Sequence, residues 1–420
     1  MLTLITYFNF SILIIFTVCY SYQIFYTLFA LFKKPKKLTA SKLHTFAVVI
    51  SARNESAVIA NLIESIKKQN YPDQLVDIYV VADNCTDNTA QIAKNAGAIV
   101  YERSNDTQRG KGYALDYIFK IIQNSEQRDK YDGYFVFDAD NLLDPNYIAE
   151  MNKVFDNGYR VITSYRNSKN YDTNWISAGY SLWFLREAKQ LNNSRMMLGT
   201  SCAISGTGFL LHKDIIRKNG GWKHHLLTED IEFSVDSAIH GEKIGYCANA
   251  MLYDEQPTKF SQSWHQRLRW SKGFYQVFGK YGGKLIKGIF KDHSFACFDM
   301  LMTISPAVFI SLISFFANTV FLIIGMCSLV TSPEIISASL TGIWNFFFNF
   351  YFILFIFGLL TVITEWKKIH CNWYKKILSL FTFPLFIFTY VPISIVALFK
   401  KVEWTPITHT IAKTIEDVNN

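Results

Sequence analysis

The chain has 420 residues, of which 50% are hydrophobic and 16% aromatic, while only 18% are charged. This charged fraction, with a formal net charge of +8, excludes a wholly soluble globular protein of ordinary composition and indicates that part of the chain lies in lipid. The seven cysteines show no close pairing or metal-ligand spacing, which argues against a disulfide framework or a zinc site.

Uncharged stretches lie at the two ends of the chain, and each exceeds the ~20 apolar residues of a spanning helix. They cover residues 1–32, 300–333, 335–364 and 377–399. The region between them is long enough for one globular domain. We therefore divide the chain into an N-terminal transmembrane helix (1–32), a basic linker (33–43), a cytoplasmic domain (44–260), interfacial helices (261–299), transmembrane or re-entrant segments (300–399) and a cytoplasmic tail (400–420).

The first apolar run has no basic residue before it and no cleavage site of small residues after it, unlike a secretory signal. We expect it to be a retained helix. Four lysines follow it directly, at positions 33, 34, 36 and 37, so the positive-inside rule places the globular domain in the cytoplasm.

Strand and helix patterns alternate through the first part of the globular region. Strands are predicted over 45–51, 77–83, 98–101 and 134–137, and helices over 56–69 and 89–96. This alternation predicts a parallel-rich α/β sheet that binds its ligands at the carboxyl ends of the strands. Asp83, Asp138 and Asp140 all fall at such ends.

The pair Asp138 and Asp140 follows a hydrophobic strand, where alternate side chains share one face. Two carboxylates on one face can hold a hard divalent cation, which in turn binds a diphosphate and neutralises charge on the leaving group. For an isolated pair, a solvated turn with an Asx cap is the stronger alternative.

Two further motifs carry polar side chains suited to group transfer. In Thr228-Glu229-Asp230 a carboxylate can act as a general base, although an ordinary helix N-cap explains this motif equally well. A helix through 263–270 places Gln266, Arg269 and Trp270 on one face, where they suit phosphate oxygens and a sugar ring. An amphipathic interfacial helix is the alternative, and both interpretations can hold together.

Taken in order, these motifs resemble the signature of processive family 2 glycosyltransferases, the relatives of cellulose, hyaluronan and chitin synthases. The resemblance spans roughly residues 45–275 and rests on five motifs and Asp83. The motifs are Ala52-Arg53-Asn54-Glu55, Arg109-Gly110-Lys111-Gly112 in a predicted loop, Asp138-Ala139-Asp140, Thr228-Glu229-Asp230 and Gln266-Arg267-Leu268-Arg269-Trp270. It implies a Rossmann-like α/β GT-A catalytic domain joined to an α-helical transmembrane and interfacial domain.

The resemblance also implies roles for individual residues. Asp140, with Asp138, would hold Mg²⁺ or Mn²⁺, and Asp230, beside Glu229, would be the catalytic base. The residues that bind the nucleotide sugar would be Glu55, Asp83, Lys111, Asp138, Gln266, Arg267 and Arg269. Those that line the acceptor site would be Trp270, Ser205, Gly206 and Thr207. Trp404, Thr405 and His409 resemble, more loosely, a gating loop. Asn141 follows Asp140 where some relatives soon have a metal-binding His, so a third protein ligand is not expected.

The implied activity is processive, inverting synthesis of a β-linked polysaccharide from a UDP-sugar, with translocation across a bacterial plasma membrane. Glucose is the expected sugar, giving a β-glucan that includes mixed-linkage 1,3;1,4 types. The alternatives are a non-processive enzyme that makes a glycolipid and a synthase that uses UDP-N-acetylglucosamine. The expected partners are the UDP-sugar, the growing polysaccharide and the lipid bilayer, with no nucleic acid and no obligatory protein partner.

Three full spans after a cytoplasmic domain would leave the tail outside, against the positive-inside rule. The segment 377–399 has basic residues on both flanks and contains Pro384 and Pro392, which interrupt a helix. We therefore expect it to be re-entrant or interfacial and to return Trp404 and His409 to the nucleotide site. A kinked spanning helix with an external tail is the alternative.

Overall fold

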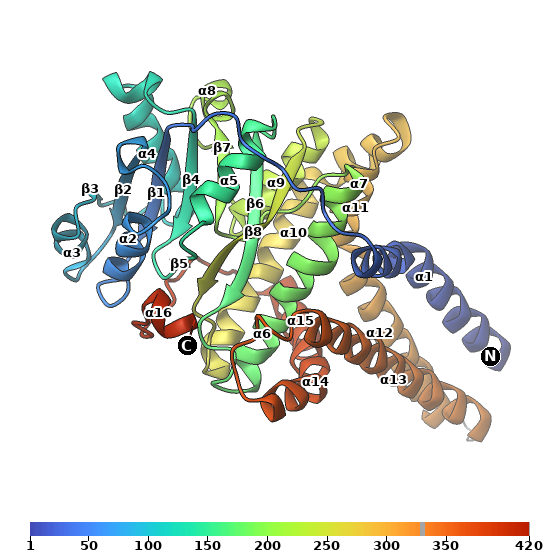
Figure 1. The fold of residues 1–420 in the computed structure, drawn as a ribbon. Coiled ribbons are helices and arrows are strands. Elements are labelled where there is room, and N and C mark those ends of the chain that lie inside the picture. The colour runs from blue at the N-terminus through green and yellow to red at the C-terminus, as the bar shows by residue number, and fades with distance from the viewer. Residues whose placement is uncertain (328–331, 420) are drawn as a thin grey trace.

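An eight-stranded mixed sheet forms the centre of the computed structural model, which describes residues 1–327 and 332–419. The strands are β1 (Phe46–Ala52), β2 (Val76–Asp83), β3 (Ile99–Arg103), β4 (Gly133–Asp138), β5 (Leu142–Leu143), β6 (Val161–Ser168), β7 (Phe209–His212) and β8 (Ile244–Asp254). Their order is β3-β2-β1-β4-β7-β6-β8-β5, and the first four in space are parallel (Figure 1). The predicted α/β class is confirmed.

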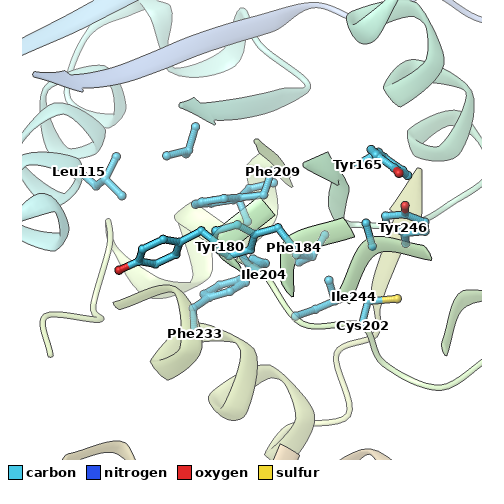
Figure 2. Packing of buried hydrophobic residues seen from close by; sticks show 14 of the residues in the cluster. Leu115, Tyr165, Tyr180, Phe184, Cys202, Ile204, Phe209, Phe233, Ile244 and Tyr246 are labelled. Carbon is cyan, nitrogen blue, oxygen red and sulfur yellow. The ribbon is translucent and has the colours of Figure 1, made fainter. Parts of the chain in front are cut away.

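Side-chain alternation along β1 explains why both faces of the sheet are covered. Phe46, Val48 and Ile50 belong to one buried cluster, whereas Ala47 and Val49 belong to another. The helices that supply the first cluster are α2 (Ile59–Lys67), α3 (Thr89–Asn95) and α5 (Tyr147–Asp156). Those that supply the second are α4 (Lys111–Gln123), α6 (Trp175–Arg186), α8 (Lys213–Asn219) and α9 (Glu229–Ile239), and Figure 2 shows part of its aromatic packing.

A second layer of helices joins the sheet to the apolar ends of the chain. After α6 the chain forms a π-helical stretch, η3 (Glu187–Asn192), and then α7 (Asn193–Leu198). The long helix α10 (Phe260–Lys291) and the short apolar α11 (Phe295–Ile304) follow the sheet. A π-helix was not expected from the sequence.

Four helical segments are long and apolar enough to cross a membrane: Leu2–Phe32, Phe309–Cys327, Pro333–Thr364 and Trp373–Phe399. They correspond to α1 (Leu2–Phe32), α12 (Pro306–Cys327), α13 (Pro333–Thr364), and the pair α14 (Trp373–Phe388) and α15 (Tyr390–Phe399). The chain is therefore membrane-associated. Residues 328–331 of the predicted apolar run lie outside the described residues. In Figure 1, α1, α12 and α13 extend away from the sheet.

The last apolar segment is broken at Thr389, between the two prolines, and its second half packs on α10. Tyr275 donates a hydrogen bond to the carbonyl of Ser394 and Lys272 to that of Ala397, so α15 runs antiparallel to α10. The tail beyond Phe399 then lies against the sheet domain and ends in α16 (Ile415–Asn419). The re-entrant arrangement remains a prediction. It requires the tail to lie on the same side of the membrane as the sheet domain, which is where the structure places it.

Candidate active site

Polar side chains gather where β1, β2 and β4 end. Because β1 pairs in parallel with both of its neighbours, their carboxyl ends meet at one edge of the sheet. This edge carries Glu55 just after β1, Asp83 at the end of β2, and Asp138 and Asp140 at and after the end of β4. The structure thus brings together four of the residues that the sequence singled out.

Asp83 is buried and already has a counter-ion. Arg103 Nη1 donates to its carboxylate at 2.5 Å, and Arg103 Nη2 donates to the carbonyl of Gln108. Asp83 therefore anchors the segment that leads into the Lys111 motif.

Glu55 faces the C-terminal tail. His409 Nδ1 lies 2.9 Å from Glu55 Oε1 and 3.0 Å from Oε2. Burial raises the pKa of Glu55 to about 7, although His409 opposes the shift. Burial lowers the pKa of His409, but the charge of Asp140 and the hydrogen bond and charge of Glu55 outweigh it and raise the pKa to about 10. His409 is accordingly a cation at neutral pH.

Lys111 links Asp138, at the end of β4, to the loop around Gly206. Its Nζ donates to Asp138 Oδ1 at 2.5 Å and to the carbonyl of Gly206 at 2.7 Å. The sequence placed Lys111 in a loop, but this is wrong because α4 begins there, with Gly110 as its N-cap at a φ of 122°. Glycine adopts this positive φ without strain. Lys111 is therefore the first residue of α4.

Asp140 is buried behind Asp138. Its Oδ2 accepts the Glu255 N–H at 2.8 Å, and its Oδ1 accepts from the Asn141 amide at 3.3 Å. Burial favours a higher pKa for Asp140, but the charges of His409 and Lys169 and the Glu255 N–H hold the pKa below its usual value. Asp140 is therefore kept ionised.

The two aspartates fit a divalent cation only as part of its coordination shell. No group of three or more His, Cys, Asp or Glu side chains suited to a metal occurs among the described residues. Asn141, directly after Asp140, accepts a hydrogen bond from Thr207 Oγ1 at 2.5 Å. Mg²⁺ is commonly held by one or two carboxylates together with substrate phosphates and water. Asp138 and Asp140 meet that pattern.

The acidic pair Glu229 and Asp230 occupies the first turn of α9. Thr228 is the N-cap residue, but its side chain makes no capping hydrogen bond, and its buried Oγ1 has no partner among the described residues. Burial raises the pKa of Glu229 to about 7 and also raises that of Asp230, while Lys111 and Arg269 oppose both shifts. A Cβ at Gly206 would lie 3.8 Å from Asp230 Oδ2, so Asp230 faces the loop that Lys111 holds.

Helix α10 presents Gln266, Arg269 and Trp270 as half-buried side chains. The Trp270 ring meets Tyr180 nearly edge to face, with centroids 5.7 Å apart, and also contacts Phe184. This aromatic group lies at the end of the sheet domain nearest to α14.

Arg267 is the member of this motif that the structure places elsewhere. It is fully buried, and its Nη1 donates to the carbonyl of Phe386 at 3.1 Å and to Thr389 Oγ1 at 2.5 Å. Its guanidinium also lies over the ring of Phe386. The expectation that Arg267 contacts the nucleotide sugar is therefore corrected, because in α10 it points toward the break between α14 and α15.

The tail covers part of the site. The indole of Trp404 lies beside Gly110, 3.6 Å from where a Cβ would stand, and the Arg53 guanidinium is 5.3 Å from the ring centroid. The backbone N–H groups of Thr410 and Ile411 donate to the Glu255 carboxylate. Thr405 is exposed, so the structure does not bring it into the site with Trp404 and His409.

Sequence reasoning missed the wall formed by the ends of β6 and β8. Arg166 Nε donates to Asp254 Oδ2 at 2.7 Å, its Nη1 donates to the Ser205 carbonyl at 2.7 Å, and its guanidinium stacks on Phe184 at 3.6 Å. The buried Lys169 lies within the electrostatic reach of Asp140. The available signal was the polar run from Asp254 to Gln256 after a hydrophobic stretch.

The chain is similar in sequence to several known proteins. The β-monoglucosyldiacylglycerol synthase of Nostoc sp. is 26% identical over 275 residues, covering 62% of this chain and 56% of that protein. The poly-β-1,6-N-acetyl-D-glucosamine synthase of Staphylococcus aureus is 25% identical over 256 residues, covering 59% of each. The chain thus spans little more than half the length of these relatives.

A solved mannosyltransferase from Pyrobaculum calidifontis, in complex with GDP-Man and Mn²⁺, shares the fold with a TM-score of 0.56 at 13% identity. The match covers 93% of this chain and 99% of that one. Residues 44–273 match the family described as glycosyltransferase like family 2. This match covers more than half of the chain, which therefore belongs to glycosyltransferase family 2 and has a GT-A fold joined to helices that are long and apolar enough to cross a membrane.

Proposed function

We propose that this protein is an inverting glycosyltransferase that moves a sugar from a UDP-sugar, with glucose preferred, onto a growing β-linked polysaccharide at a bacterial plasma membrane and passes the polymer across it. One chain of contacts carries the proposal: Asp230 faces the Gly206 loop, and Lys111 joins that loop to Asp138. A candidate base thereby lies beside the loop that Lys111 joins by hydrogen bonds to the candidate diphosphate site.

The donor side has the charges that a nucleoside diphosphate requires. Lys111 forms an ion pair with Asp138. When the UDP-sugar binds, Lys111 would leave this carboxylate and pair with a phosphate oxygen instead. Gln266 and Arg269 would contact the same diphosphate from α10. A divalent cation held by Asp138 and Asp140 would neutralise charge on the departing UDP.

The acceptor side is set by Asp230. Its raised pKa suits a general base, because an elevated pKa increases the driving force for taking a proton from a sugar hydroxyl. The acceptor oxygen forms a bond to the anomeric carbon as the bond to the UDP oxygen breaks, and the hydroxyl proton passes to Asp230. A single displacement of this kind inverts an α-linked donor to a β-glycoside.

An aromatic platform supports a polysaccharide as the acceptor. Trp270 stands on the same helix as Arg269, with Tyr180 and Phe184 against it. Flat apolar rings suit the C–H face of a sugar, and the loop of Ser205, Gly206 and Thr207 would line the rest of the acceptor site. Retention of the product between additions is the property that distinguishes a polymerase from a single-sugar transferase.

A glycolipid synthase is the second candidate function. The relative from Nostoc is named for a glucosylated diacylglycerol, and the apolar helices next to the site would give a lipid acceptor a route to Asp230. The two functions share the donor site and differ in the acceptor.

The test is product analysis with the full-length protein in lipid vesicles. Radiolabelled UDP-glucose or UDP-N-acetylglucosamine is supplied with Mg²⁺ or Mn²⁺, and the label is separated into chloroform-soluble and polymeric fractions. Polymer that linkage-specific β-glucanases digest supports the proposal, with Asp230→Asn as the inactive control. Label confined to chloroform would overturn the polysaccharide assignment, and incorporation of N-acetylglucosamine without glucose would overturn the glucan.

A further inference from the structure

Two arginines lie buried beside α1, where this candidate span meets the sheet domain, and their surroundings differ. Arg195 forms a two-pronged ion pair with Asp299, with distances of 2.8 Å from Nε and 2.7 Å from Nη2. Tyr22 and Tyr26 of α1 donate hydrogen bonds to the same carboxylate. The charge of Arg195 is therefore balanced inside the chain.

Arg186, at the end of α6, has no such balance. It is only 5% exposed, and Nη2 donates to Gln23 Oε1 at 2.8 Å. In residues 1–327 and 332–419 its buried Nε has no hydrogen-bond partner and no carboxylate forms an ion pair with it, although the charge of the adjacent Glu187 acts on it from a longer distance. The rings of Phe357 and Trp183 lie 4.4 and 5.7 Å from the guanidinium carbon. The adjacent Glu187 side chain is instead hydrogen-bonded to Ser205, on the catalytic side.

The position of Arg186 is fixed by the spans that it touches. Along their helices, Gln23 of α1 lies about 14 Å, and Phe357 of α13 about 10 Å, from the ends at Phe32 and Thr364 that join the sheet domain. Both residues therefore lie in the part of the spans nearest to the sheet domain, from which a long arginine side chain can reach the headgroup region. Trp183, which is 37% exposed, lies at the same level, where indole rings are favoured.

A guanidinium at this depth is costly without an anion, because its charge is largely removed from water. Phosphate is the anion that lipid offers there, and the planar fork of arginine matches two phosphate oxygens. Gln23 can hold the guanidinium in place, and the two rings can cover its faces.

We propose that Arg186 binds the phosphate of an anionic phospholipid from the leaflet that faces the sheet domain, in a site formed by α1, α6 and α13. The site does not depend on the proposed function, because no donor or acceptor residue belongs to it. Its ligand is a phospholipid whose headgroup carries a net negative charge. Arg186 contacts the phosphate, and Trp183 lies beside the headgroup.

The experiment counts lipids bound to purified full-length protein by native mass spectrometry. Phosphatidylglycerol is compared with phosphatidylcholine of the same acyl chains, for the wild type and for Arg186→Met, Arg186→Lys and Arg128→Met. The methionine removes a charge that forms no ion pair among the described residues, so we expect Arg186→Met to stay folded, which its melting temperature in detergent checks. Arg128 is exposed on the sheet domain and serves as the matched control.

Wild type and Arg128→Met should retain phosphatidylglycerol in preference to phosphatidylcholine. Arg186→Met should bind phosphatidylglycerol about ten- to a hundredfold more weakly, with Arg186→Lys in between. Equal retention by a folded Arg186→Met variant would overturn the site. Displacement of the lipid by millimolar inorganic phosphate or glycerol 3-phosphate would show a site for a soluble anion and overturn its assignment to lipid.

Discussion

His409 Nδ1 lies 2.9 Å from Glu55 Oε1, although 354 positions separate the two residues in the chain. This contact ties the C-terminal tail to the loop after β1, at the edge of the sheet where the nucleotide is expected. The same tail places Trp404 beside Gly110 and Arg53. The tail is thus positioned to control access to the donor site.

Truncation after Lys401 should abolish synthesis without preventing membrane insertion, because Trp404 and His409 would no longer close over the nucleotide. The measurement is product formation by membranes that contain equal amounts of each protein. Labelling of a cysteine placed at Thr408 by an impermeant thiol reagent, applied outside intact cells, would contradict the position of the tail. Polymer made by the truncated protein would contradict its role.

Asp230→Asn should leave UDP binding unchanged and reduce transfer about 10²- to 10⁴-fold, the usual contribution of a general base. The amide keeps the size of the side chain but cannot take the acceptor proton. UDP affinity by calorimetry and turnover by UDP release separate the two effects. Normal turnover would remove Asp230 from the catalytic role.

The pH profile should show an acidic limb set by the carboxyl pair. Burial raises the pKa of Glu229 to about 7 and raises that of Asp230, and the base works only when it is deprotonated. The value of kcat/KM should therefore rise with pH through the weakly acidic range. Lys111→Met removes a charge that lowers both pKa values, so it should move this limb to higher pH. A flat profile between pH 5 and 8 would contradict the assignment.

Asp140→Asn should abolish turnover because it removes one of the two carboxylate charges available to the cation. Chelation of divalent ions should have the same effect on the wild type, and added Mg²⁺ or Mn²⁺ should reverse it. Titration of Mn²⁺, followed by its paramagnetic signal in the presence of UDP, compares the two proteins. Unchanged Mn²⁺ affinity in the variant would place the cation elsewhere.

Trp270→Ala should lose polymer synthesis while retaining some hydrolysis of the UDP-sugar. The ring is expected to hold the acceptor between additions, and its removal leaves the donor residues in place. Product length and free sugar are measured in the same reaction, with Trp270→Phe as the conservative control. Polymer of full length from the alanine variant would refute the acceptor platform.

Local patterns in the sequence were sufficient for the first half of the sheet. The strands through Phe46, Val80 and Phe135 are short apolar runs that end in turn residues, and each pairs in parallel with at least one neighbour. The strands β6, β7 and β8 escaped prediction because their pairing is mixed and is decided by partners far along the chain. A periodic pattern reports the local conformation but not which strands pair.

The sequence by itself determined the family motifs, the apolar ends and the carboxylates Asp138, Asp140 and Asp230, because these depend on residue type and on spacing within one element. Only the tertiary structure decided which side chains meet. Helix α10 turns Arg269 toward the site and Arg267 away from it, since residues two positions apart on a helix point about 200° apart and so lie on nearly opposite faces. Contacts between His409 and Glu55, or between Arg166 and Asp254, join segments that are far apart in the sequence, so no local pattern predicts them.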